Sequence, residues 1–182
     1  MRRNQVRRVR RDRFRTALLA PVLLVVAAAG LSACEIGVDC DGEVYFAGAD
    51  LSGTDQSGKQ LMQCDLSGIN FAGASFADAS LGNADLTGAD LSGADFDGAD
   101  LKNAILVGTN VAGAEFGAVD NVLVSSGGVT GTPASLPVNW TLTGGFFVGP
   151  GVNLVGADLS GVDLSSTNLT FAFLTDADLA GA

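Results

Sequence analysis

The chain has 182 residues, with twenty acidic and ten basic side chains, a formal net charge of −10 and no histidine. This length suits one domain and a targeting segment. The lack of histidine excludes Ser–His and Cys–His catalytic arrangements and the usual zinc sites, and the acidic balance excludes a reader of nucleic acid.

Residues 1–33 have the three parts of a secretory signal. Eight arginines lie within the first fifteen positions, and Ala17–Ala29 follows as thirteen uncharged apolar residues. That run is too short for a transmembrane helix, which needs about 20 residues. Leu31–Cys34 (Leu-Ser-Ala-Cys) resembles the bacterial lipobox, which implies cleavage before Cys34 and lipidation of this cysteine. The alternative is a plain signal peptide that ends near a cysteine.

Cleavage before Cys34 changes the charge of the remaining chain. Two lysines then face nineteen acids, a formal net charge of about −17. Such a chain is not attracted to anionic lipid, so acyl chains have to hold it at the membrane. We therefore expect an exported protein, anchored through Cys34 to the bacterial cell membrane or outer membrane.

Residues 34–43 form a short polar tether that we expect to cap the start of the domain. With Cys34 acylated, Cys40 and Cys64 remain as an even pair in an oxidising compartment. A disulfide between them would tie the tether to the domain. The alternative is that Cys64 is a small buried residue, since its repeat position usually holds alanine.

Residues 44–118 repeat every five positions, most clearly at Ala84–Lys102, which reads ADLTG ADLSG ADFDG ADLK. A period of five gives no apolar stripe on an α-helix. A short strand fits, because the small first residue and the large apolar third residue (the centre) share one face. The fifth residue is usually glycine, which suits a turn with positive φ. The chain therefore turns once per unit.

Four such turns close a square coil of 20 residues, so residues 20 positions apart stack in columns. The inward centres are then almost all apolar. We expect Gln56 and Lys59, at inward positions, to distort their coil or make it bulge outward. The predicted core of this part is Phe46, Leu51, Leu66, Phe71, Phe76, Leu81, Leu86, Leu91, Phe96, Leu101, Leu106 and Phe116.

These A-[DN]-[LF]-x-x units resemble the bacterial pentapeptide-repeat family over 44–118 and 152–182. The resemblance implies an all-β fold, a right-handed quadrilateral β-helix with about 20 residues per coil and one irregular insert. Members of this family have diverse functions, so the resemblance indicates the fold far better than the activity.

Residues 119–151 interrupt the repeat with a segment rich in Gly, Ser, Thr and Pro that holds the one tryptophan, Trp140. The segment resembles an insert found in many bacterial pentapeptide proteins. Short apolar runs predict a hairpin packed on the flank of the helix. Either this is a functional loop, or it is a decorated coil anchored by Trp140.

Six more units follow over 152–182, and no capping helix comes after them. An uncovered last coil exposes a β edge, so an end-to-end homodimer is expected if nothing else covers it. The centres predicted for the core here are Leu159, Leu164, Leu169, Leu174 and Leu179.

The repeated acids are candidates for paired-carboxylate catalysis or calcium binding. Within one coil, however, they lie on four different faces of a solvated surface, away from any cleft. Residues 39–43 and 95–100 resemble the start of a calcium loop but lack its spacing and terminal glutamate. We predict no enzyme activity, no metal site and no cofactor.

Three function classes remain. The first is a lipid-anchored, non-enzymatic scaffold or protein-interaction surface of the cell envelope with an unknown protein partner. The second follows from the resemblance, because some pentapeptide-repeat proteins imitate duplex DNA and bind type II topoisomerases; an export signal argues against it. The third, an envelope enzyme acting on polysaccharide, is disfavoured by the missing histidine and the lack of a cleft.

Overall fold

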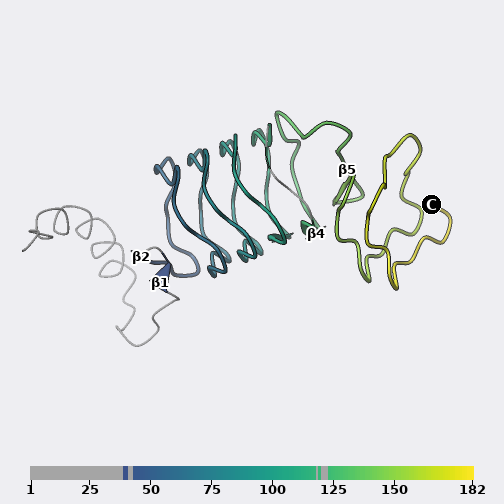
Figure 1. The fold of residues 1–182 in the computed structure, drawn as a ribbon, viewed down its shortest axis with the longest axis horizontal. Helices are drawn as coiled ribbons and strands as arrows, with labels where there is room; N and C mark the ends of the chain where they lie inside the picture. The colour runs from purple at the N-terminus through teal and green to yellow at the C-terminus, as the bar shows by residue number, and fades with distance from the viewer. Residues whose placement is uncertain (1–38, 41–42, 118, 120–122) are drawn as a thin grey trace, which may run out of the picture. The chain divides into compact units, whose positions relative to one another are not determined.

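The computed structural model describes residues 39–40, 43–117, 119 and 123–182. The predicted leader and the lipidation site Cys34 lie outside these described residues. The described chain is built almost entirely of short extended segments joined by tight turns (Figure 1).

Six short strands are present among the described residues, in three pairs. The first and third pairs are antiparallel hairpins, and the second is a parallel pair between successive coils. The strands are β1 (Asp39–Cys40) with β2 (Glu43–Val44), β3 (Ile105–Val107) with β4 (Ser125–Gly127), and β5 (Thr141–Thr143) with β6 (Phe146–Val148).

Parallel bridges between residues 20 positions apart connect the repeat units. Asp50 pairs with Asn70, Asn70 with Asp90, and Asp90 with Asn110, and similar columns run along the other faces. Figure 1 shows the result as successive loops of chain stacked side by side between β2 and β4. Backbone hydrogen bonds join each loop to the next, for example from Leu91 N–H to the Asn110 carbonyl at 2.8 Å.

The corners of the coils use positive φ angles, as the fifth repeat position predicts. Gly88 has φ 67° and Gly93 has φ 64°. A β-carbon at Gly98 would clash with the Asp78 carboxylate of the coil before it, so that corner has no room for a side chain. Glycine thus permits both the turn and the close stacking of corners.

The core is one column of centres per face. Phe76, Phe96 and Phe116 stack with ring centroids 4.9 Å apart and nearly parallel planes. Alanines line the rest of the narrow interior. The buried centres are Leu61, Leu66, Phe71, Phe76, Leu81, Leu86, Leu91, Phe96, Leu101, Leu106, Val111 and Phe116.

The expected distortion at Gln56 is wrong. Gln56 is 3% exposed, and its coil keeps the regular register. Its amide accepts a hydrogen bond from the Tyr45 hydroxyl at 3.2 Å and donates one to Thr54 Oγ1 at 2.8 Å. A buried polar group is tolerated when its hydrogen bonds are made. Lys59 is half-buried rather than enclosed.

Several predicted core residues near the two ends are less buried than expected. Phe46 and Leu51, in the first described coil, are half-buried. Leu164, Leu169 and Leu174 are also half-buried, and Leu179 is 44% exposed. Leu159 is fully buried. The half-buried and exposed centres all lie in the first or last coils that the structure describes, although Gln56 and Leu61 of the first coil are buried.

The segment 119–151 is irregular only in part. Ser125, Thr130 and Ser135 still pair with residues 20 positions earlier. In the column that holds Ser125, the next bridge joins Ser125 to Asn153, which is 28 positions on instead of 20. The additional residues form the β5–β6 hairpin, whose two-residue turn is Gly144–Gly145 with φ 57° and 81°. We call this break in register, between 135 and 152, the seam.

The buried apolar residues form two clusters, one on each side of the seam. The large cluster runs from Tyr45 to Val129 and includes Phe147, and the small one is centred on Val152, Leu154 and Leu159. Trp140 packs against both clusters. This side chain, predicted to anchor the insert, therefore lies where the two clusters meet.

Candidate functional site

The outward aspartates serve first as caps for the turns. In most units the Oδ1 atom of the second residue accepts a hydrogen bond from the backbone N–H two positions on, for example Thr87 N–H to Asp85 at 2.9 Å and Ser92 N–H to Asp90 at 3.0 Å. This local bond satisfies a backbone donor at the corner of the coil. The sequence therefore repeats aspartate or asparagine at this position for a structural reason.

Where a serine stands two positions on, its hydrogen bonds lower the pKa of five of the described carboxylates. Hydrogen bonds from the side chain and backbone of Ser67 hold the pKa of Asp65 below its ordinary value of 3.8. Serines two positions on, first through their side chains, likewise lower the pKa of Asp50, Asp55, Asp158 and Asp163. A general acid needs a raised pKa, so these shifts point away from acid catalysis.

Stacked acids are separated by amides on the face that holds Asp50. The amide of Asn70 donates to Asp50 at 3.0 Å, and the amide of Asn110 donates to Asp90 at the same distance. Each pair replaces repulsion between carboxylates with a charge-assisted hydrogen bond. The face is therefore a stable, solvated ladder rather than a cluster of strained acids.

The calcium-like segments do not form a site in the part of the chain that the structure describes. No three His, Cys, Asp or Glu side chains gather there as metal ligands. Asp95 instead accepts a hydrogen bond from the backbone N–H of Asp97 at 2.9 Å. In the segment 39–43, Asp41 lies outside the described residues.

The cysteines stand as follows. Cys64 is 2% exposed and takes part in a disulfide. Cys40 lies in β1, but its side chain is outside the described residues, so its pairing with Cys64 stays a prediction. Lipidation of Cys34 likewise stays a prediction.

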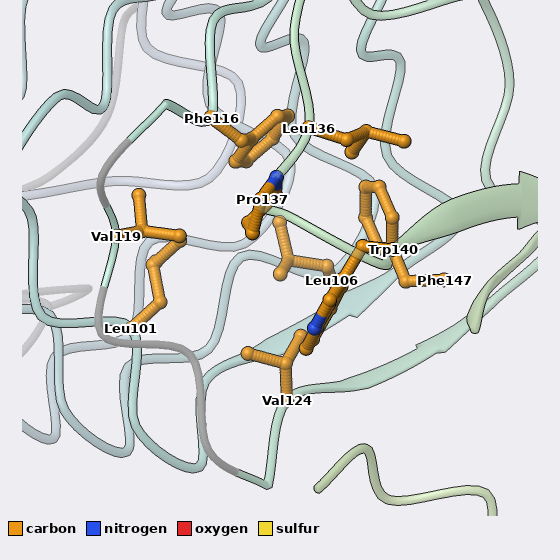
Figure 2. A pocket seen from close by; sticks show the side chains of 9 residues that line it. All are labelled: Leu101, Leu106, Phe116, Val119, Val124, Leu136, Pro137, Trp140 and Phe147. Carbon is orange, nitrogen blue, oxygen red and sulfur yellow. The ribbon is translucent and has the colours of Figure 1, made fainter. Parts of the chain in front are cut away.

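An apolar cavity lies beneath the insert (Figure 2). Repeat centres such as Phe116 form its floor, Leu136, Pro137 and Trp140 come from the insert, and Phe147 comes from β6. The room in it is about 10 Å³, close to that of one water molecule. Ligand pockets are usually about 300–1,000 Å³. This cavity is a packing defect under the insert rather than a substrate site.

Two residues of the insert and the C-terminal coils, Gly149 and Phe171, were not identified as candidates by the sequence analysis. A β-carbon at Gly149 would lie 2.5 Å from Cγ and Cδ1 of Trp140, so Gly149 makes room for the indole. Phe171 occupies a corner position with φ 61° and is 85% exposed. The signal for Phe171 was present, since an aromatic residue stands where the repeat elsewhere favours glycine, asparagine or aspartate.

The family model of pentapeptide repeats matches eight copies over residues 60–93, 94–119 and 151–182. These matches cover 92 of the 182 residues. The chain belongs to the pentapeptide repeat family. Pentapeptide repeat proteins fold as right-handed quadrilateral β-helices and are generally non-enzymatic structural or binding proteins. The prediction of the repeat family is thus confirmed.

Three solved pentapeptide repeat proteins are similar to the chain. Rfr23 from the cyanobacterium Cyanothece 51142 is 29% identical over 52% of this chain and 63% of its own, with a TM-score of 0.26. HetL from Nostoc sp. strain PCC 7120, involved in heterocyst differentiation regulation, is 28% identical over 74% and 59%, with a TM-score of 0.24. A thylakoid-lumen protein from Arabidopsis thaliana is 32% identical over 65% and 70%, with a TM-score of 0.20.

The chain thus spans less than two thirds of the length of the two cyanobacterial pentapeptide repeat proteins. No curated protein matches it. No helix in the described part of the chain is both long and apolar enough to cross a membrane.

Proposed function

We propose that this pentapeptide repeat protein is a non-enzymatic scaffold of the bacterial cell envelope, anchored by lipid at Cys34, whose coils present a binding surface to another protein. The observation that carries the proposal is the use of the outward carboxylates. They cap turns, and within one coil they lie on separate faces; Asp50 and Asp65 are among those whose pKa is lowered by a neighbouring serine. Such a surface suits recognition by charge and shape, and it lacks the converging groups that catalysis needs.

The anchor is supported by the order of the leader, with arginines first, then Ala17–Ala29, then the Leu31–Cys34 lipobox. It is tested by growing cells with a radioactive fatty acid and comparing wild type with Cys34→Ala. We expect label on the wild-type protein and none on the variant, which keeps its uncleaved leader. An unlabelled wild type would remove the anchor and the envelope location together.

A second candidate is a DNA-mimicking binder of a type II topoisomerase. The acidic columns on the outside of the coils favour it, for example Asp55, Asp95 and Glu115 on one face. It requires the protein to remain in the cytoplasm. Fractionation of cells that carry a tagged copy separates the two candidates. A protein that stays in the soluble cytoplasmic fraction and still carries Met1–Ala33 would favour the second candidate.

A further inference from the structure

The C-terminal coils carry an aromatic surface formed by Phe171, Phe173 and Val155. We propose that this aromatic surface docks a basic segment of a partner protein, one in which apolar side chains alternate with lysine or arginine. The inference rests on the proposed scaffold function and specifies where on the coils the partner binds. Figure 1 shows these coils in yellow, next to the C-terminus.

Phe171 is the first observation. It stands in a corner column with Gln63, Asn83, Asn103, Leu123 and Gly151, all with positive φ. The asparagines suit that conformation and bond to each other, Asn103 Nδ2 to Asn83 Oδ1 at 3.2 Å, and glycine adopts it freely. Phenylalanine does not favour positive φ, and its side chain has no group that could form such a hydrogen bond. At 85% exposure its ring also gains little from packing in the folded chain. Gln63 in the same column is strained and exposed as well, but Phe171 also places a large apolar ring in solvent, and that combination is a reason to look for a ligand.

Phe173 and Val155 extend this apolar corner along the adjoining face. Phe173 is 50% exposed at the repeat position that holds Asp or Asn in most units. It pairs with Asn153 of the coil before it, so Val155, two residues on and 53% exposed, is its diagonal neighbour. Three exposed apolar side chains thus occupy outward positions of the same coils, and exposed apolar side chains that gather on one surface mark interaction sites.

The charge around the aromatic surface indicates the chemistry of the partner. From residue 103 to 182 the sequence has no lysine or arginine, while Asp176 and Asp178 follow the aromatic pair in the same coil. A second copy would bring the same acids, and an anionic membrane would be repelled. A basic segment with interleaved apolar side chains complements both the phenyl rings and the carboxylates.

The test uses the full chain in a nonionic detergent and two fluorescein-labelled peptides of equal charge and length. One peptide alternates arginine with leucine, and the other alternates arginine with serine. Fluorescence anisotropy should show the arginine–leucine peptide binding about tenfold more tightly. Phe171→Gly and Phe173→Asn should each weaken that binding by about tenfold, the effect of losing one anchor side chain. Met62→Gln, which removes a 54% exposed side chain far along the repeat, should leave the affinity unchanged.

Equal affinity for the two peptides, or an equal loss in Met62→Gln, would overturn the proposal, because binding would then follow net charge or general apolarity. So would loss of self-association in Phe171→Gly, measured by light scattering, or loss of binding to phosphatidylcholine vesicles in the same variant. Circular dichroism shows whether each variant keeps its fold, and glycine suits φ 61°. Fatty-acid labelling of Phe171→Gly should match wild type, so a failed anchor and a failed docking surface give different results.

Discussion

The regular coils over 45–117 and the C-terminal coils over 150–182 share one repeat but differ in burial. In the regular coils the centres from Gln56 to Phe116 are almost fully enclosed, as with Leu86 and Leu91 at 0% exposed. In the C-terminal coils Leu174 is only half-buried. The repeat therefore specifies a coil, whereas the neighbours on both sides decide how much free energy its centre contributes.

The two regions are also joined differently from two ordinary coils. Successive regular coils share backbone hydrogen bonds on all four faces. Across the seam, the described residues bond at one side, from Leu123 N–H to the Gly151 carbonyl and from Asn153 N–H to the Val124 carbonyl. Elsewhere the hairpin fills the gap with apolar contacts, chiefly from Trp140 and Phe146. The C-terminal coils should therefore open before the regular ones do.

The largest expected effect comes from shortening one centre in each region. Leu86→Ala should lower the free energy of unfolding by about 2–5 kcal/mol, since it leaves a cavity in a closed core. Leu174→Ala should cost about 1 kcal/mol, because the site is already half exposed and can collapse. Urea unfolding measures both changes. Equal losses would show that the two regions are enclosed to the same extent.

Trp140→Ala should loosen the seam. We expect amide hydrogen exchange to speed up over 152–182 and stay unchanged over 60–100, with a cost of about 2–3 kcal/mol to the C-terminal coils. Trp140→Phe, which keeps an aromatic ring in contact with both clusters, serves as the control and should show a smaller change. Faster exchange along the whole chain would mean that the two regions unfold as one unit.

Gly149→Ala should disturb the packing of Trp140, because Gly149 lies against the indole ring. Its methyl group would lie 2.5 Å from Cγ of Trp140, so the indole has to move, at a cost of about 1–3 kcal/mol. Gly82→Ala is the matched control, because its nearest neighbour would be at 3.7 Å. Thermal unfolding compares the two variants, and a similar melting temperature for both would contradict the role assigned to Gly149.

Phe171→Gly should stabilise the C-terminal coils by about 1 kcal/mol, because it removes the strain of a left-handed phenylalanine that is hardly buried. Gly161→Phe, at an unstrained glycine corner with φ 66°, is the converse change and should destabilise the same coils. Urea unfolding followed by circular dichroism checks the signs. Destabilisation by Phe171→Gly would show that the ring packs within the fold.

The smallest expected effect is on the stability of the fold at acidic pH. The pKa of Asp65 is lowered in the folded state by Ser67, so its contribution to stability is present above pH 4 and is lost as the pH falls through the folded pKa. Because Asp65 is largely exposed, the contribution is at most about 0.5 kcal/mol. Ser67→Ala should reduce the loss of stability between pH 6 and pH 3, measured by urea unfolding. An unchanged pH dependence would mean that the cap contributes nothing.

The regular coils could be predicted because each of their contacts is local or repeats at one spacing. The pairing of Asp50, Asn70, Asp90 and Asn110 follows from their 20-residue separation, and so does the stack of phenylalanines. Gln56 was misjudged because its partner Tyr45 belongs to a different column. A distance in sequence does not show such a contact.

The seam could not be placed from the sequence, for a related reason. The segment after residue 118 lacks the alanine and leucine pattern, yet Ser125 and Thr130 still continue the columns through backbone bridges, which need no particular side chain. The shift to a spacing of 28 depends on how the β5–β6 hairpin packs against the coils. The role of Phe171 depends on its exposure, which the repeat pattern does not give.

The uniform 20-residue spacing of the columns has a consequence for how this protein can change during evolution. Duplication of any twenty consecutive codons within the regular coils adds one complete turn whose new neighbours are copies of the old ones. Every corner, cap and stacked side chain finds an equivalent partner, and the structure becomes longer by about 4.8 Å, the spacing of paired strands. The length of the regular region can therefore vary by whole turns, without any matching change on the far side of the seam.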